Sequence, residues 1–315
     1  MEDQIPYKSV PILEAPPLEL IMERTKERKP FLIRNFDIGP CKSEWTPEYM
    51  SQKMGSTPVK IHVSIHPKLD FINKNFLYKT LPFDELLTRI SSRKSENHFI
   101  QENELYYLRS LGSDRRGKDV ANFMNDFPEL AHDLKFPKVF DEAAFFSAIL
   151  RISSAGIQIW THYDIMDNIL IQIRGKKKII LWPPSEVEYL YLMGDKSKVI
   201  DVERGHPEKY PKFIKAARYQ CLLEEGDIIF IPALWFHNIT ALEMSVGVNI
   251  FWKNLPDDFY DKKDTYGNKD LTVATKAFSA LENSIKALDT LPFEYKDFYL
   301  KRMVQMLQEK LESIN

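Results

Sequence analysis

The feature that most constrains the fold is a series of short runs rich in β-branched and aromatic residues, which begins near residue 146. Turn-forming residues separate the runs, and Glu225-Gly226-Asp227 is one such turn directly before a run. Closely spaced strands without intervening helices favour a sandwich or barrel over repeated βαβ units. The predicted strands cover residues 149–153, 158–160, 168–173, 178–182, 227–231 and 245–252.

The chain before this region has mixed character. Residues 29–34 predict a short strand, and residues 46–54 predict a helix that begins with a Thr46 cap and Pro47. Residues 81–87 predict the start of another helix, and residues 92–97 predict a polar loop. We therefore predict an α+β protein with a mainly β catalytic core, a double-stranded β-helix (jelly roll) with flanking helices. The predicted divisions are 1–100, a mixed segment packed on the barrel, 101–255, the core, and 256–315, a helical region.

The last 45 residues contain two stretches whose apolar residues recur every three or four positions, which predicts a helical hairpin. Pro292 separates the two stretches. The two apolar stripes could pack on the chain's own β core, or they could bind a second copy of the chain in a homodimer. The stripes are formed by Ala274, Phe278, Leu281, Ile285 and Leu288, and by Leu300, Met303, Leu307, Leu311 and Ile314.

Composition limits the chemistry and the compartment. The formal net charge is −2, so the whole chain is not a basic nucleic-acid binder, although local patches could still bind one. Two cysteines cannot form a disulfide framework or a four-sulfur zinc site, so any metal must be held by His, Asp and Glu. The N-terminus lacks a secretory signal pattern, and the longest apolar stretch, 228–236, is interrupted by Pro232. We expect a soluble intracellular protein, cytoplasmic or nuclear, with no membrane partner.

His162 and Asp164 are the strongest candidates for metal ligands. Residues two apart in a strand point to the same face, so this pair presents an imidazole beside a carboxylate. About one such pair is expected by chance, and a second, His206 with Glu208, lies in a polar segment that we interpret as a surface loop. His237 follows a predicted strand and a Pro-containing turn, which would place it at the mouth of a barrel. Two His and one carboxylate are the ligand set of non-haem Fe(II) oxygenases.

The surroundings of these three residues resemble the JmjC-domain family of Fe(II)/2-oxoglutarate oxygenases, which have a cupin-like barrel. The resemblance rests on Trp160-Thr-His-Tyr-Asp164, on Gly175-Lys-Lys-Lys178, and on the stretch from Gly226-Asp to Trp-Phe-His237. Further stretches, such as Tyr106-Tyr-Leu-Arg-Ser-Leu-Gly112, resemble the tRNA hydroxylases of wybutosine synthesis. With these stretches the resemblance covers essentially the whole chain.

The resemblance implies that His162, Asp164 and His237 bind Fe(II), with 2-oxoglutarate as cosubstrate and dioxygen as oxidant. A lysine pairs with the distal carboxylate of 2-oxoglutarate in this family, and Lys177 stands at the matching place, although alternation alone cannot exclude Lys176 or Lys178. One position departs from the asparaginyl-hydroxylase branch, because Ile159 stands where that branch has Thr. The other expected cosubstrate residues are Tyr107 (with Tyr106 as its rival), Asn168 and Asn249.

The resemblance also implies the substrate: the hypermodified guanosine beside the anticodon of phenylalanine tRNA, hydroxylated on its amino-carboxypropyl side chain. Candidate phosphate-binding groups are a possible helical stripe of Lys209, Lys212, Lys215 and Arg218, the clusters at 115–118 and 174–178, and Arg151. Each cluster could instead be an ordinary solvated surface. The alternative functions are hydroxylation of a protein side chain, a non-catalytic cupin-like adaptor, or a metal-dependent isomerase or lyase.

Overall fold

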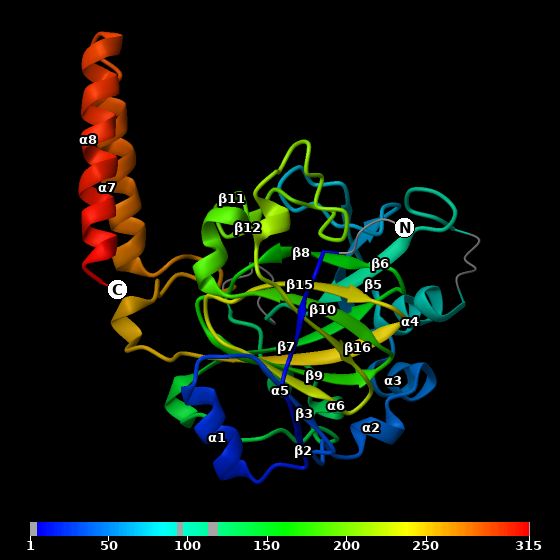
Figure 1. Cartoon of the computed structure of the whole chain (residues 1–315). Helices are drawn as coiled ribbons and strands as arrows, with labels where there is room; N and C mark the ends of the chain where they lie inside the picture. Colours follow the sequence, from blue (N-terminus) through cyan, green and yellow to red (C-terminus); the bar gives the residue numbers. More distant parts are fainter. Residues whose placement is uncertain (1–4, 93–96, 113–118, 315) are drawn as a thin grey trace. The chain divides into compact units, whose positions relative to one another are not determined.

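Two β-sheets make up the larger unit of the protein (Figure 1). The computed structural model describes residues 5–92, 97–112 and 119–314. Within them, one sheet has the strand order β1-β13-β10-β15-β8-β12-β11, and the other has the order β2-β3-β14-β9-β16-β7-β6-β4-β5. The strands are β1 (Lys8–Ser9), β2 (Ile12–Glu14), β3 (Phe31–Arg34), β4 (Pro58–Ser64), β5 (Leu77–Pro82), β6 (Leu105–Arg109), β7 (Phe145–Ser153), β8 (Gln158–His162), β9 (Asp167–Arg174), β10 (Lys177–Trp182), β11 (Leu192–Met193), β12 (Lys196–Ser197), β13 (Tyr219–Leu223), β14 (Ile228–Ile231), β15 (Phe236–Ala241) and β16 (Ser245–Trp252).

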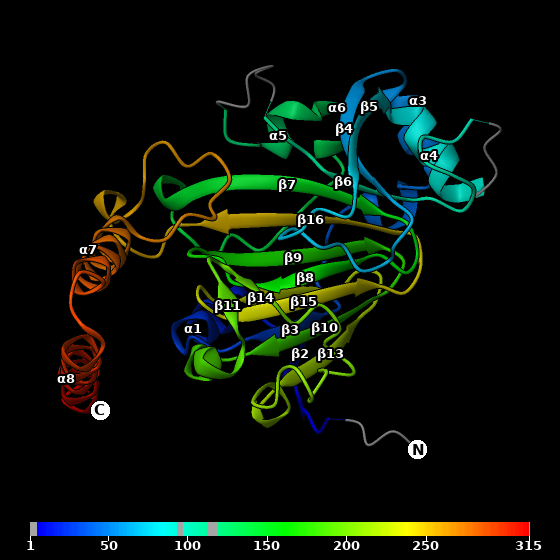
Figure 2. The same ribbon diagram turned by 90° about the horizontal axis from the view of Figure 1, so that it is seen from above.

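Short helices precede and interrupt the sheets. Figure 2 shows α3 and α4 beside the end of the larger sheet that β4 and β5 form. The helices are α1 (Leu18–Lys26), α2 (Cys41–Glu44), α3 (Pro47–Met54), α4 (Phe83–Ser92), α5 (Phe123–Asp126), α6 (Pro128–Ala131), α7 (Thr272–Leu288) and α8 (Phe293–Glu312), with 3₁₀ turns η1 (Glu142–Ala144), η2 (Pro184–Tyr189), η3 (Phe213–Lys215) and η4 (Asp257–Phe259).

The larger sheet is covered on both faces. On one face, Leu170 of β9 and Ile229 of β14 pack with Ile179 and Leu181 of β10 from the other sheet. On the opposite face, Ile169 and its neighbours pack with residues of the short helices, in one apolar core. Because both faces are buried, β9 and β16 are almost continuously buried rather than alternating between apolar and polar residues.

The predicted fold class is confirmed, since each predicted run of the β region coincides with a strand, apart from Asp227 just before β14, and the strands form two packed sheets. The predicted helix at 46–54 is also present: the Thr46 side chain accepts a hydrogen bond from the N–H of Tyr49, and Pro47 is the first helical residue. The polar loop predicted at 92–97 lies largely outside the described residues. Strands β4 and β5 of the N-terminal segment pair directly with the same sheet as β6 and β7.

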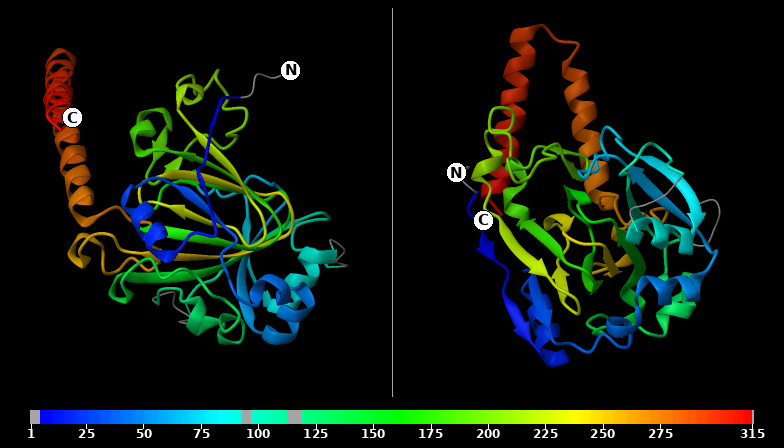
Figure 3. Two further views of the ribbon diagram at one scale, coloured as in Figure 1. Left: turned by 60° about the horizontal axis from the view of Figure 1, so that its bottom comes forward. Right: turned by 90° about the vertical axis from the view of Figure 1, so that its right-hand side faces the viewer.

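A second compact unit comprises Pro256–Asp261 and Asp270–Asn315. Its helices α7 and α8 run antiparallel as a hairpin (Figure 3), as the apolar stripes predict. Neither helix contains a buried residue, so the rest of this unit does not cover the apolar stripes. Among the described residues, no helix combines the length and the apolar character that crossing a membrane requires.

Candidate active site

His162 and His237 face each other across neighbouring strands. They are direct partners in the antiparallel pairing of β8 with β15, and their ring centroids lie 4.3 Å apart. Directly opposite residues of an antiparallel pair project from the same face of the sheet, so both imidazoles lie on one side. The register shifts between His237 and Ile239, an irregularity that is common next to functional sites because it turns the side chains locally.

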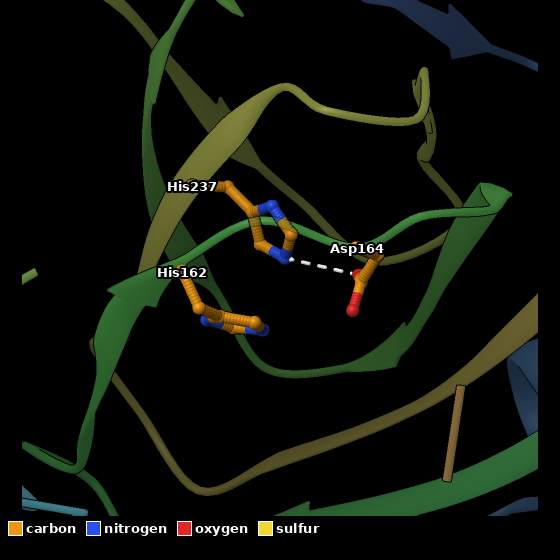
Figure 4. A group of neighbouring side chains, drawn as sticks. All are labelled: His162, Asp164 and His237. Carbon is orange, nitrogen blue, oxygen red and sulfur yellow. Dashed lines mark ion pairs between the residues drawn. The ribbon is translucent and has the colours of Figure 1, made fainter. Parts of the chain in front are cut away.

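Asp164 completes the cluster from the segment that follows β8. Its Oδ2 atom lies 3.5 Å from Nε2 of His237, and the three side chains converge in Figure 4. The main chain joins the two ligand-bearing segments, because the N–H of Leu234 donates a hydrogen bond of 2.8 Å to the carbonyl of Asp164. Leu234 has a φ of 69°, in the left-handed region that branched side chains rarely adopt. This strained turn follows Pro232, and His237 lies three residues beyond Leu234, near the start of β15.

Asp167 and Arg28 support the same turn, and sequence reasoning missed both. Asp167 accepts a hydrogen bond of 2.8 Å from the N–H of Ala233 and one of 2.6 Å from Nη2 of Arg28. The carbonyl of Arg28 in turn accepts a hydrogen bond of 3.0 Å from Nε1 of Trp235. Arg28 is 139 residues away from Asp167 along the chain, so no local sequence signal could connect them.

The hydrogen bonds of the two imidazoles suit them for metal binding. Nδ1 of His162 donates to the carbonyl of Trp160 at 2.9 Å, and Nδ1 of His237 donates to the carbonyl of Trp235 at 3.1 Å. A carbonyl can only accept, so Nδ1 carries a proton in each ring and Nε2 is the nitrogen left to bind a cation. One potential ligand atom from each of His162, Asp164 and His237 lies within 4.8 Å of the other two. This donor set, two imidazoles and one carboxylate, suits a divalent transition metal such as iron.

Burial sets the charge of the cluster. It lowers the pKa of His162 well below its usual value, and the neighbouring His237 lowers it further. It raises the pKa of Asp164, against the opposing effects of His237 and of the guanidinium groups of Arg151 and Arg109. Desolvation penalises a charged carboxylate without a full counter-charge, so a bound cation would relieve a cost that the protein already bears.

A cavity beside the cluster contains one buried lysine. Lys177 is 5% exposed and lines the cavity together with His162, Asp164 and His237. No acidic partner of Lys177 is present among the described residues, and burial lowers the pKa of its ammonium group to about 7, with Arg151 adding to the effect. Gly247 leaves room for the lysine, because a Cβ atom there would lie 3.1 Å from its Nζ atom.

The neighbouring lysines point elsewhere. Nζ of Lys176 lies 3.8 Å from a carboxylate oxygen of Glu224, and Lys178 forms an ion pair with Glu203. Of the three lysines that the sequence left open, only Lys177 lines the cavity. Alternation along β10 therefore places it on the inner face of the sheet.

Three further polar side chains line the same cavity as Lys177: those of Tyr107, Arg151 and Asn249. The phenolic oxygen of Tyr107 accepts a hydrogen bond from Nη1 of Arg151, and Nε of Arg151 donates to the Oδ1 atom of Asn249 at 2.7 Å. The sequence predicts Arg151 only as a phosphate contact, so its place in the cavity wall is a finding of the tertiary structure.

The rival tyrosine and Asn168 have different surroundings. Tyr106 donates a hydrogen bond of 2.6 Å to Glu104 and lines a separate pocket. Asn168 lies behind Asn249, whose Nδ2 donates to the Oδ1 atom of Asn168 at 3.1 Å, and it is not among the residues that line the cavity. A direct contact between Asn168 and a cosubstrate therefore stays a prediction. Ile159 does line the cavity, and its side chain adds no hydrogen bond there.

Comparison with known proteins identifies the family. The model of the cupin-like domain matches residues 17–258. The chain is 52% identical to the tRNA wybutosine-synthesizing protein 5 of Homo sapiens over 307 residues, which cover 97% of each chain. The chain belongs to the tRNA wybutosine-synthesizing protein 5 family. It is 53% identical to the Gallus gallus protein of that name, over 90% of this chain and 89% of that one. It is also 35% identical to the tRNA wybutosine-synthesizing protein 4 of Aspergillus oryzae, where the match covers 27% of that longer protein. The predicted resemblance is confirmed.

In this member of the wybutosine-synthesizing protein 5 family, the predicted basic stripe is wrong in two respects. First, residues 209–218 do not form a helix with one basic face, because Pro211 interrupts them and only the 3₁₀ turn η3 is helical. Second, Arg218 is buried. Arg218 donates hydrogen bonds to the carbonyls of Ile5 (2.8 Å) and Val202 (3.1 Å), so it stabilises the N-terminal segment instead of facing solvent. Lys209, Lys212 and Lys215 are exposed.

The other basic clusters carry less free charge than the sequence suggests. In the cluster at 174–178, Nη1 of Arg174 lies 3.6 Å from a carboxylate oxygen of Glu225, and Lys176 and Lys178 have the acidic partners named above. The cluster of Arg115, Arg116 and Lys118 lies outside the described residues. The prediction of a surface loop holds for His206, whose ring pairs with exposed Glu208.

Proposed function

We propose that this protein is an Fe(II)- and 2-oxoglutarate-dependent hydroxylase of the wybutosine pathway. Its substrate would be the hypermodified guanosine beside the anticodon of phenylalanine tRNA, and the reaction would hydroxylate the amino-carboxypropyl side chain. The observation that carries the proposal is the His162–Asp164–His237 cluster opening into a cavity that holds the buried ammonium group of Lys177. Membership of the wybutosine-synthesizing protein 5 family supports the pathway and the tRNA partner.

In this proposal, His162, Asp164 and His237 hold Fe(II) through two Nε2 atoms and one carboxylate oxygen. The iron, with 2-oxoglutarate and dioxygen, supplies the oxidising power for C–H hydroxylation when bound, so no side chain has to act as acid, base or nucleophile. The protein's own residues set the geometry. The carbonyls of Trp160 and Trp235 orient the imidazoles, and the Leu234 turn keeps Asp164 beside His237.

We further propose that Lys177, Tyr107 and Asn249 hold the dianionic cosubstrate, with Asn168 in support. A carboxylate can pair with the ammonium group of Lys177 and accept a hydrogen bond from the hydroxyl of Tyr107. Arg151 contacts both Tyr107 and Asn249, so we add it to this set as the group that positions them. The hydrogen bond that a threonine at position 159 would give the cosubstrate can be replaced by the polar side chains of Tyr107, Asn249 and Asn168 and by the cations Lys177 and Arg151.

The decisive experiment incubates the iron-loaded protein with 2-oxoglutarate, dioxygen and phenylalanine tRNA that carries the wybutosine precursor. We expect a mass increase of one oxygen on the modified base, with one succinate released per base hydroxylated. Unmodified phenylalanine tRNA is the control and gains no oxygen. Turnover of a peptide library but not of the modified tRNA would instead support a protein hydroxylase, and absence of both reactions would support a non-catalytic adaptor.

Exposed Lys209, Lys212 and Lys215 remain our candidates for contacts with tRNA phosphates. They lie within one short segment and have no acidic partner among the described residues. Phosphate binding needs such local clusters of cations rather than a basic chain as a whole. We also propose that the protein acts on its tRNA in the cytoplasm or the nucleus.

We also propose that the α7–α8 hairpin forms a homodimer. Its large apolar side chains include Phe278, Phe298, Leu307 and Leu311, each at least 56% exposed. Exposed apolar area of this size on two helices of 17 and 20 residues is costly in water unless a partner covers it. Light scattering should give twice the chain mass of 37.0 kDa.

The double variant Phe298→Asp/Leu307→Asp should lower that mass to one chain, because buried charge opposes association. Gln308→Asp, on the same helix, is the matched control and should leave the dimer intact. A wild-type protein that sedimented as a single chain at micromolar concentration would contradict the proposal.

A further inference from the structure

A second cavity of about 390 Å³ opens outward from the candidate metal cluster. His162 and Asp164 line it as well as the inner cavity, so a molecule in it would reach the metal directly. Its other lining residues include cations, one further acid and aromatic rings. This lining suits a polar, charged ligand with a flat ring better than a hydrocarbon. Of the residues proposed for the cosubstrate, Tyr107 and Arg151 line both cavities, whereas Lys177 and Asn249 line only the inner one. We therefore assign the outer cavity to the substrate.

Arg109 and Arg151 bring positive charge to one side of this cavity. They are direct partners across β6 and β7, and neither has an acidic partner in the described parts of the chain. Arg151 is occupied by Tyr107 and Asn249, whereas the side chain of Arg109 has among the described residues only a long hydrogen bond, 3.4 Å to the carbonyl of Tyr266. Two neighbouring guanidinium groups that form no ion pair with a described residue attract an anion, and the planar fork of Arg109 suits a carboxylate.

Asp195 brings the opposite charge from another element. It immediately precedes β12, which pairs with β8 at Lys196 and His162, so it lies beside the strand that carries a metal-ligand candidate. Its side chain is 15% exposed and forms an ion pair with Lys196. A carboxylate has about four lone-pair positions, so Asp195 can accept a second cation while it keeps this pair.

Two aromatic rings are exposed in the same cavity. Tyr78 and Tyr266 line it and are 49% and 48% exposed, which is high for side chains of a concave site. The guanidinium carbon of Arg109 lies 5.0 Å from the ring centre of Tyr266. A flat base could stack on such rings.

We propose that the outer cavity binds a zwitterionic side chain, with Arg109 on its carboxylate, Asp195 on its ammonium group and Tyr78 and Tyr266 against its base. This inference rests on the proposed function and deepens it, because it names the part of the substrate that is selected. A phosphate would use only the cations, while a neutral side chain would leave both charges unpaired at a cost in affinity. The carbon chain between base and head group then passes the metal cluster.

The test compares three forms of the modified nucleoside: one with the free amino-acid side chain, its methyl ester and its N-acetyl derivative. Calorimetry on the metal-free protein measures binding, and hydroxylation of the corresponding tRNAs measures KM and kcat. Arg109→Gln should weaken binding of the free form about 10- to 100-fold and should affect the ester less than threefold, because the ester has already lost the partner charge. Asp195→Asn should likewise weaken binding of the free form about 10- to 100-fold and should affect the N-acetyl derivative less than threefold, because that derivative has already lost its ammonium charge.

Arg24→Gln, which changes an exposed arginine paired with Glu27, is the matched control and should change none of these constants. Arg109→Lys keeps the charge without the fork, so it should recover part of the affinity and also tests the proposal if Arg109→Gln folds poorly. Equal losses for the free form and the ester would overturn the inference, as would no loss at all. Failure of the wild-type protein to bind or hydroxylate any form would instead overturn the proposed function.

Discussion

Replacement of Asp164 with asparagine is expected to lower hydroxylation at least about 1000-fold. The variant keeps the shape of the side chain but removes the negative charge of the three-residue ligand set. Saturating Fe(II), or Mn(II) as a stable substitute, should stabilise the wild-type protein by about 2.7 kcal/mol at 100 times its Kd, and this shift should vanish in the variant. Thermal melting with and without metal measures it.

In the absence of metal, Asp164→Asn should not lower the free energy of unfolding. Because burial raises the pKa of Asp164, the charged carboxylate destabilises the folded protein above that pKa, and protonation removes the penalty as pH falls. Asp164→Asn should therefore leave the metal-free protein at pH 7 at least as stable as the wild type. Glu208→Gln is the matched control, since it changes the other His-x-acid pair at an exposed position, and it should retain activity and metal binding. Hydroxylation that survived in Asp164→Asn would refute the proposed metal centre.

Replacement of Lys177 with methionine should raise the 2-oxoglutarate concentration needed for half-maximal activity about 100-fold. The variant removes the buried ammonium group while it keeps most of the side-chain volume, and a charged hydrogen-bond partner in a dry site is worth a few kcal/mol. Lys176→Met is the matched control, because its neighbouring ammonium group pairs with Glu224 outside the cavity. Titration of the metal-loaded protein with 2-oxoglutarate gives the affinity directly. An unchanged affinity in Lys177→Met would remove the lysine from the cosubstrate site.

The pH dependence gives a second signature of Lys177. Burial lowers the pKa of Lys177 from the ordinary lysine value of 10.5 to about 7. Below pH 7 the folded and unfolded states are both protonated, so folding bears the full cost of the buried charge. Between pH 7 and 10.5 the unfolded chain binds more protons, and this cost is progressively lost as pH rises. Lys177→Met should therefore be more stable than the wild type near pH 6, with a smaller difference at pH 9. Cosubstrate binding needs the protonated lysine, so wild-type affinity should fall above pH 7.

Local sequence patterns predicted much of the structure because their physical causes are local. β-branched runs between turn residues favour strands through local interactions. At the start of α3, the side chain of Thr46 accepts a hydrogen bond from a free N–H group of the first helical turn, and Pro47 follows it. The two-residue spacing of His162 and Asp164 suggested one strand face, although β8 ends at His162 and Asp164 lies in the segment that follows. The proline-containing turn before His237 is also a local signal. The three ligand candidates could therefore be found without coordinates.

Other assignments depended on which strands become neighbours. Lys177 differs from Lys176 and Lys178 only in which face of β10 meets the second sheet, and Arg218 is buried because the N-terminal segment returns to cover it. Arg151 belongs to the cavity because β7 lies between β6 and β16, which brings Tyr107 and Asn249 to it from residues 44 and 98 positions away. The sequence by itself thus determined six strand runs of the β region, the helical hairpin and the three candidate metal ligands. Only the tertiary structure decided which charged groups face the cavity, because that depends on contacts between distant segments and not on periodicity within one.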